Sequence, residues 1–220
     1  MKIIITGATG MAGSEVLRQA INDNGITEMT AIVRKPLTTE HPKLTTIIHK
    51  DFMDYSGLQE VFKNNDACLW CLGISQNAVD ENQYITITYD YTLAAANAML
   101  QANPSISFLF LSSDGASSDE KSRFLFGRIK GKTENALTRL PFRKLYIARP
   151  AGILPANSSA SFPFALRLQY LFVRIMRYIT PAYVITSVNL AKTLLYIIKN
   201  GPDKTIFSFR EINDIAKGIN

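Results

Sequence analysis

The sequence predicts an α/β fold, a doubly wound parallel sheet with helices on both faces and a small C-terminal cap. Short apolar runs alternate with helical patterns from residue 3 to residue 149, which is typical of parallel strands joined by crossover helices. A glycine-rich turn directly follows the first of these runs. The 220 residues, 47% of them hydrophobic, suffice for one substantial core, so we expect a single domain over residues 1–220.

The N-terminal segment carries the strongest signal. A strand pattern at Ile3–Ile5 breaks into glycines at positions 7, 10 and 13, and a helical stretch, 14–20, follows. In such a unit the first glycine permits a tight turn, the second lets the backbone approach a dinucleotide pyrophosphate, and the third lets the helix pack close to the strand. The phosphates bind the free N–H groups at the helix N-terminus. This pattern favours a Rossmann-like dinucleotide site over an ordinary glycine turn; its expected residues are Thr6, Gly7, Thr9, Gly10, Met11 and Gly13.

The remaining elements follow in alternating order. Strands are expected at 29–34, 44–49, 66–72, 106–111 and 145–149, with helices at 56–64, 84–101 and 122–140. Beyond Pro150 the alternation lapses. Residues 152–187, rich in Pro, Ser and aromatic residues, are expected to form a small cap over the cofactor site, and a helix at 188–199 and a strand at 205–208 follow.

Residues just after the strands are candidates for ligand contact, because ligands of open parallel sheets bind beyond the carboxyl ends of the strands. Arg34 and Lys35 follow the second strand, where an acidic residue would bind a ribose 2′-OH and a guanidinium would pair with a 2′-phosphate. This predicts NADP in preference to NAD, and a solvated surface pair is the alternative. Asp51 and Phe52 follow the third strand as candidates for adenine contact, with a turn role for Asp51 as the alternative. Gly73 follows the fourth strand as a further candidate.

Five motifs, in this order, resemble those of the short-chain dehydrogenase/reductase superfamily. They are the glycine turn Thr6–Gly13, the hydroxyl-rich turn Ser112–Ala116, and the segments Lys130–Glu134, Arg149–Gly152 and Asn189–Ala191. The similarity covers nearly the whole chain. The combination of the second, third and fourth motifs looks most like the atypical single-domain branch that contains the Tat-interactive-protein-type oxidoreductases.

The resemblance implies an NADP(H)-binding oxidoreductase that acts on a small molecule, with a serine, a tyrosine and a lysine as its working set. The serine would orient a substrate carbonyl, the tyrosine would exchange the proton, and the lysine would bind the nicotinamide ribose. On this chain Ser113 matches the serine, with Ser112 as the close second, and Lys130 matches the lysine. Phe126 stands at the tyrosine position.

Phe126 is the main departure from the family pattern. A phenyl ring has no hydroxyl with which to exchange a proton, and a general acid typically contributes about 10²–10⁴-fold to the rate. Three interpretations stay open. A substrate or water relay could dispense with the phenol, or another hydroxyl such as that of Tyr84 or Ser112 could serve. The third is a non-catalytic NADP(H)-binding regulatory or partner-binding protein.

The net charge is +6 and the pI is about 9.3. Part of this charge lies in Arg167, Arg174 and Arg177, which alternate with apolar residues in a pattern typical of an amphipathic helix. Such a helix can bind a membrane or a partner, but we favour a docking helix whose arginines face water or an anionic ligand. No stretch is similar to a nucleic-acid-binding module, so we expect no nucleic-acid partner.

Cys68 and Cys71 fall within an expected strand, where positions three apart face opposite sides of the sheet. We interpret them as buried thiols in preference to a redox or metal-binding pair. His41 and His49 lie far from every motif, so we expect no metal site and no Ser-His-Asp hydrolase. The chain shows no pattern of a signal peptide or membrane span, which predicts a cytoplasmic protein whose partner is a small-molecule substrate or none. The oligomeric state stays open.

Overall fold

The structure is a computed structural model that describes residues 1–156, 180 and 183–219. Its main feature is a seven-stranded sheet in the order β3-β2-β1-β4-β5-β6-β9, with every neighbouring pair parallel. The strands are β1 (Lys2–Thr6), β2 (Glu28–Val33), β3 (Leu44–Ile48), β4 (Ala67–Trp70), β5 (Ser107–Leu111), β6 (Lys144–Ala148) and β9 (Ile206–Phe207). The predicted α/β fold with a parallel sheet is therefore confirmed.

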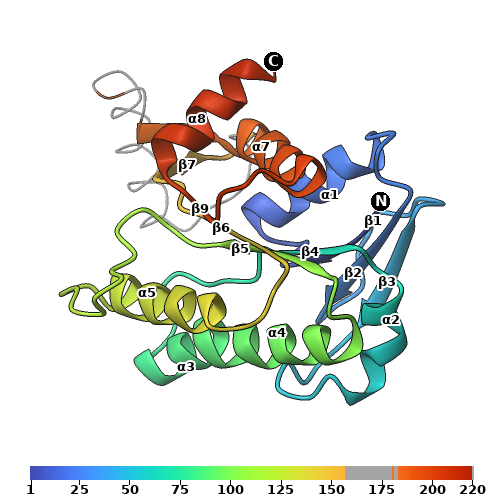
Figure 1. Cartoon of the computed structure of the whole chain (residues 1–220), viewed down its shortest axis with the longest axis horizontal. Helices are drawn as coiled ribbons and strands as arrows, with labels where there is room; N and C mark the ends of the chain where they lie inside the picture. The colour runs from blue at the N-terminus through green and yellow to red at the C-terminus, as the bar shows by residue number, and fades with distance from the viewer. Residues whose placement is uncertain (157–179, 181–182, 220) are drawn as a thin grey trace.

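Helices cover both faces of the sheet (Figure 1). One face packs against α1 (Met11–Ile21) and α7 (Ser187–Asn200), and α8 (Phe209–Gly218) packs on α7. The other face packs against α2 (Gln59–Lys63), which continues a short 3₁₀ turn η1 (Ser56–Leu58), and against α4 (Tyr91–Ala102) and α5 (Leu125–Thr138). This is the doubly wound arrangement.

Alternation along each strand supplies both layers of the core. Ile3 and Ile5 lie in the cluster under α1 and α7, whereas Ile4 lies in the cluster under α2 and α4. Cys68 and Cys71 divide between the two faces in the same way, as the sequence predicts. Because the central strands are covered on both sides, their residues form nearly continuous apolar runs, whereas the edge strand β3 has no buried residue.

The strand order reverses between β1 and β4. The chain passes from β1 outward to β2 and β3, then returns to place β4 on the other side of β1. In open parallel sheets ligands bind in the crevice at such a reversal, beyond the carboxyl ends of the strands. The glycine turn after β1 and Gly73 after β4 lie at this point.

The helix expected at 84–101 is interrupted. It consists of α3 (Glu81–Ile85), a π-helical segment η2 (Thr86–Asp90) and α4. The carbonyl of Thr88 accepts hydrogen bonds from the hydroxyls of Thr92, at 2.8 Å, and of Thr133 on α5, at 3.4 Å. These two side-chain hydrogen bonds are made to a backbone carbonyl within the interrupted segment. The hydrophobic periodicity of the sequence does not reveal such an interruption.

Helix α8 was not expected, although the sequence carries its signal. Ser208 and Glu211 form a capping box, in which the Ser208 hydroxyl caps the Glu211 N–H while the Glu211 carboxylate accepts from the Ser208 N–H at 3.0 Å. A Ser-x-x-Glu pattern after a short strand predicts a helix start at this position.

The predicted cap, residues 152–187, is described only at its two ends. There β7 (Gly152–Leu154) pairs in parallel with β8 (Val184–Thr186) as a separate two-stranded sheet, and Ser187 already begins α7. The basic segment 167–177 lies outside the described residues. The cap over the cofactor site therefore stays a prediction.

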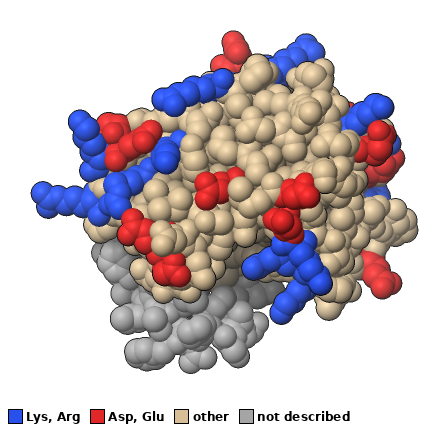
Figure 2. Space-filling view, turned by 90° about the horizontal axis from the view of Figure 1, so that it is seen from below, with Lys and Arg blue, Asp and Glu red and all other residues tan. Residues whose placement is uncertain are grey.

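The face that carries α2 to α5 is of mixed charge. Figure 2 shows basic and acidic side chains interspersed, mainly around the rim of a largely uncharged surface. One ion pair, between Arg128 on α5 and Glu81 on α3, spans two helices at 3.4 Å. This pair links the start of α5 to α3.

Replacing Ser208 with alanine should lower the free energy of unfolding by about 1 kcal/mol, because the N-cap of α8 is lost. Urea denaturation measures the change. Ser105→Ala is the matched control, since Ser105 is exposed in the turn before β5 and should change stability by less than about 0.5 kcal/mol. Equal losses for both variants would contradict a capping role.

Candidate functional site

The turn after β1 requires glycine at two positions. Gly7 has a φ of +66°, and a Cβ there would lie 2.4 Å from the Cys71 carbonyl oxygen. A Cβ on Gly13 would lie 2.2 Å from the Gly7 carbonyl oxygen. Backbone atoms cannot move aside as side chains do, so only glycine allows β1, β4 and α1 to approach this closely.

The N-terminus of α1 lacks a side-chain cap. Its N-cap is Gly10, whereas Thr186 caps α7 and Ser208 caps α8. Backbone N–H groups of a helix start that no side chain caps can bind an anion, and the helix dipole favours negative charge there. Thr9 and Gly10 are exposed and Met11 is partly exposed, so this helix end is accessible. The cradle fits a dinucleotide pyrophosphate.

Thr6 and Gly73 lie on the two sides of the reversal. The Thr6 side chain is buried, and its hydroxyl accepts a hydrogen bond from the Leu72 N–H at 3.3 Å, which joins the ends of β1 and β4. Gly73 is exposed, and no described atom lies within 4 Å of the position of an added Cβ. Thr6 thus joins the two strand ends at the reversal, while Gly73 leaves space beside them.

The candidates for the adenosine half lie after β2 and β3. Arg34 and Lys35 are exposed, and neither side chain forms an ion pair within the described part of the chain. The Asp51 carboxylate accepts a hydrogen bond from the Met53 N–H at 2.9 Å, the turn role kept open above. The Phe52 side chain is buried against Tyr55 and other aromatic rings, so only its backbone is left to contact a ligand.

One face of α5 contacts the turn after β5. Phe126, Lys130 and Glu134 are four residues apart, and such residues share one side of a helix. The Phe126 ring lies 3.4 Å from the position of a Cβ on Gly115, and the Lys130 ammonium donates to the Leu111 carbonyl at 3.1 Å. Glu134 accepts a short hydrogen bond from the Ser112 hydroxyl. Three successive turns of the helix therefore position residues 111–115.

Glu134 is the centre of a buried ionic network that the sequence analysis missed. Its side chain is 2% exposed, and Arg149 at the end of β6 donates to both carboxylate oxygens from Nε at 3.0 Å. A further bond comes from Arg149 Nη2, which also donates to Ser118 at 3.1 Å. Removal of one partner of such a pair typically costs about 3–5 kcal/mol, because the other charge stays buried and uncompensated. The motif residues Glu134 and Arg149 thus hold β5, α5 and β6 together.

The two adjacent serines differ in what binds them. Ser112 donates its hydroxyl to Glu134, so this group is already engaged. The Ser113 Oγ is buried and has no hydrogen-bond partner among the described residues. A buried polar atom without a partner is uncommon and points to a ligand or water. This arrangement supports Ser113 over Ser112 as the candidate serine.

The environment of Lys130 makes its ammonium more acidic than that of an ordinary lysine. Burial disfavours the ammonium charge and lowers the pKa of Lys130 to about 8, although the Glu134 carboxylate acts in the opposite direction. The ammonium also lies 5.3 Å from the centroid of the Phe110 ring. The group therefore exchanges its proton near neutral pH.

Two tyrosines, Tyr84 and Tyr183, are candidates for the phenol that is absent at Phe126. Tyr84 is 1% exposed; burial raises the pKa of its phenol, which hydrogen-bonds with Thr88. Tyr183, missed by the sequence analysis, hydrogen-bonds with Asp114 in the turn after β5. Burial and the Asp114 carboxylate raise the pKa of Tyr183, so its phenol holds its proton tightly. No motif indicates this pair, since it joins residues 69 positions apart in the chain.

Gln76, in the loop after β4, was also missed. Its side-chain oxygen accepts a hydrogen bond from the Phe126 N–H at 2.8 Å. This bond caps the first turn of α5 from a distant loop. A lone glutamine in a loop gives no sequence signal for such a contact.

The two cysteines are free thiols. Burial raises the pKa of Cys68 strongly and that of Cys71 to about 12, so neither forms a reactive thiolate at neutral pH. Within residues 1–156, 180 and 183–219, no three His, Cys, Asp or Glu side chains gather as a metal site would require.

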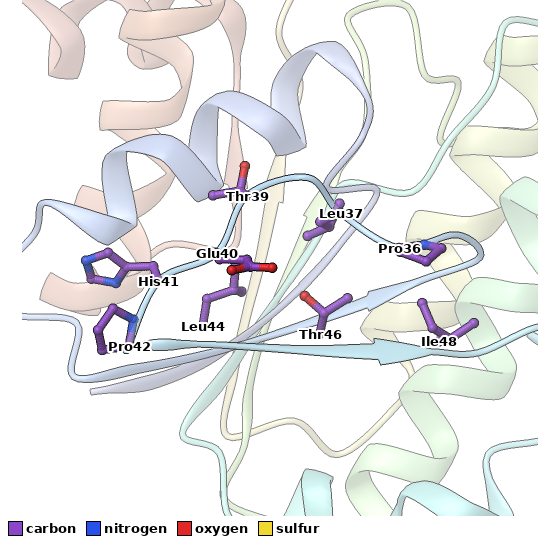
Figure 3. Close-up of a pocket in the computed structure, with 9 residues that line it drawn as sticks. All are labelled: Pro36, Leu37, Thr39, Glu40, His41, Pro42, Leu44, Thr46 and Ile48. Atoms are coloured by element: carbon purple, nitrogen blue, oxygen red, sulfur yellow. The ribbon is translucent and has the colours of Figure 1, made fainter.

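A hollow of about 620 Å³ lies at the β3 edge of the sheet, between this strand and the loop before it. Figure 3 shows Leu37, Thr39 and Glu40 of that loop lying over Leu44 and Thr46 of β3. Ser113 and Lys130 are not among its lining residues. Its nearest link to the candidate site is Pro36, which follows Arg34 by two residues.

Comparison with known proteins identifies the family. A family model described as NAD(P)H-binding matches residues 7–139. The chain belongs to this family. The match includes the three glycines of the turn and Lys130, and the similarity to the short-chain dehydrogenase/reductase superfamily is confirmed.

Three proteins similar to this chain illustrate its place in the NAD(P)H-binding family. Protein HTATIP2 of Rattus norvegicus is 29% identical over 73% of this chain, and the alignment spans 66% of that protein, just under two thirds. Protein FMP52, mitochondrial, of Meyerozyma guilliermondii is 27% identical over 99% of this chain and 96% of its own. The Bordetella bronchiseptica enzyme WbmG, solved in complex with NAD, has a TM-score of 0.69 and 13% identity, covering 100% of this chain and 78% of that chain.

These relationships establish an NAD(P)-binding, Rossmann-like, oxidoreductase-like chain. They do not distinguish NADP from NAD. None of the described helices combines the length and apolarity needed to cross a bilayer. Because the FMP52 relative is named as mitochondrial, a cytoplasmic location stays a prediction.

Gly13→Ala should lower the free energy of unfolding by about 1–3 kcal/mol or more, because its Cβ would overlap a backbone carbonyl. Chemical denaturation measures this loss. Gly57→Ala is the matched control, since no described atom lies within 4 Å of its Cβ position. A Gly13→Ala protein as stable as Gly57→Ala would show that the close approach of α1 to β1 is wrong.

Proposed function

We propose that this protein is an NADP(H)-dependent oxidoreductase that acts on a small carbonyl compound. The observation that carries the proposal is the buried hydroxyl of Ser113, which has no partner among the described residues and follows β5 two residues after Leu111, whose carbonyl binds Lys130. At the same strand end, the Ser112 hydroxyl is bound by Glu134 and the Leu111 carbonyl by Lys130. A free hydroxyl in such a setting suits a substrate oxygen.

The chain offers a contact for each part of the cofactor. The glycine turn and the start of α1 would bind the pyrophosphate, and Asp51 with the backbone of Phe52 would lie beside the adenine. Arg34, assisted by Lys35, would pair with a 2′-phosphate, since no acidic residue stands at this position. Lys130 would bind the nicotinamide ribose. When bound, the dihydronicotinamide supplies a hydride.

Ser113 would orient the substrate by donating its hydroxyl to the carbonyl oxygen. Such a donor stabilises the negative charge that develops on that oxygen as the carbon is reduced. Phe126 packs against the same turn but contributes no proton. The substrate is therefore expected to bind between the turn after β5 and the cofactor, in the cytoplasm and without a nucleic-acid partner.

A second candidate function is a non-catalytic NADP(H)-binding regulatory or partner-binding protein. Phe126 favours it, because a site that retains its serine and lysine but lacks the phenol keeps cofactor binding more readily than catalysis. The two functions share the same cofactor cradle and differ in turnover.

Arg34→Ala should weaken NADPH binding about tenfold or more and leave NADH binding nearly unchanged, because a charge-assisted bond to phosphate contributes roughly 1.5–3 kcal/mol. Titration calorimetry with both cofactors measures the effect. Arg143→Ala, at an exposed site before β6, is the matched control for loss of one surface charge. Equal losses for NADPH and NADH would contradict the NADP preference, and no binding of either by the wild type would contradict the proposed function.

Phe126→Tyr should leave NADPH affinity roughly unchanged, because the two side chains differ by one hydroxyl. With a panel of aldehydes and ketones, a silent wild type whose variant gains turnover, by up to about 10²–10⁴-fold, would support the regulatory function. A wild type that already reduces a carbonyl, is impaired by Ser113→Ala and gains nothing from Phe126→Tyr would support the enzyme. Product formation, followed by mass spectrometry, measures turnover directly.

A further inference from the structure

A carbonyl reductase needs a proton donor, and Ser113 is already assigned to orienting the substrate oxygen, while the other candidate hydroxyls are engaged or buried. Ser112 is bound to Glu134, Tyr84 is buried against Thr88, and Tyr183 is held by a carboxylate. We propose that Lys130 is the proton donor of this site, in the role that Phe126 cannot fill. This inference rests on the proposed function and assigns its proton step.

The geometry places the Lys130 ammonium at the end of β5. It donates to the Leu111 carbonyl at 3.1 Å, and Ser113 follows two residues later. An ammonium has three N–H donors, and that bond uses one of them. The Phe126 ring, one turn earlier on α5, packs on Gly115 of the same turn. Lys130 and Ser113 therefore lie at the same strand end, where a substrate oxygen would bind.

The charges around Lys130 suit a donor that works near neutral pH. The pKa of about 8 results from burial, and Glu134 is the charged group that opposes this effect. Arg149, from β6, and Ser112, from β5, share the Glu134 carboxylate, which limits how far it stabilises the ammonium. From the π-helical segment, the Tyr89 ring contacts Lys132 instead, at 4.4 Å. Enzymes tune lysine pKa values to about 7–8 for general acid–base catalysis.

The proton step balances. The substrate carbon accepts a hydride, so a C–H bond forms and the π electrons of the C=O bond move to oxygen. An N–H bond of Lys130 breaks, and its proton forms the O–H bond of the alcohol. The substrate is reduced by two electrons and the dihydronicotinamide is oxidised. Neutral Lys130 then regains a proton from water.

The first test needs no cofactor. Acetic anhydride labels only neutral amines, so the pH dependence of labelling reports when Lys130 loses its proton. The free protein is labelled at pH values from about 6 to about 11, and labelling is measured by peptide mass spectrometry. An ordinary lysine has a pKa of about 10.4. We expect a midpoint near pH 8 for Lys130. Exposed Lys132, two residues along the chain, is the internal reference for labelling. Glu134→Gln should shift the Lys130 midpoint to lower pH. A midpoint in the ordinary lysine range would overturn the inference and leave the proposed function intact.

The second test separates proton donation from ribose binding. At saturating NADPH, Lys130→Ala should lower turnover of a carbonyl substrate by about 10²–10⁴-fold, while Lys132→Ala should not change it. Added alkylammonium ions of similar size should restore turnover to Lys130→Ala in order of their acidity. Rescue that is independent of acidity would overturn the donor role, because it would report charge alone. A wild type that binds NADPH but reduces no carbonyl would overturn it too and support the regulatory function, whereas a wild type that does not bind NADPH would contradict the proposed function itself.

Discussion

The buried carboxylate of Glu134 is the constraint on which the candidate site depends. It accepts hydrogen bonds from Ser112 at the end of β5 and from Arg149 at the end of β6, while its own backbone belongs to α5. Two strands and a helix are thereby held at fixed spacing by one group. With Ser112 engaged, the neighbouring Ser113 is the hydroxyl left without a described partner. The same carboxylate also acts on the charge of Lys130, where it opposes the lowering of the pKa that burial causes.

The two halves of the site are built on different physical principles. The pyrophosphate cradle is a backbone structure, in which Gly7 and Gly13 allow close approach and the start of α1 presents N–H groups. Such a cradle tolerates no added Cβ but depends little on side-chain chemistry. The half around β5 and α5 depends instead on charged and polar side chains. It can lose one group, as at Phe126, while its scaffold stays in place.

Phe126 illustrates this separation. The ring contacts the turn after β5 in the way a tyrosine ring there would, and its N–H is bound by Gln76 from the loop after β4. Packing alone therefore does not require the hydroxyl. Whether chemistry continues depends on other groups at the same strand end, and Lys130 is the one whose pKa lies near neutrality.

The sequence by itself predicted the α/β fold with its alternating elements and the glycine cradle, because these follow from local periodicity and a short motif, while the candidates Ser113 and Lys130 came from the family resemblance. Helix α8 was not predicted despite the Ser208–Glu211 pattern, and the helix interrupted by a π-helical segment was predicted as continuous. Only the tertiary structure decided which of two adjacent serines is free and how the charge of Lys130 is biased. The physical reason is that both depend on Glu134 and Arg149, which act across elements distant in the chain, and desolvation depends on everything packed around a group.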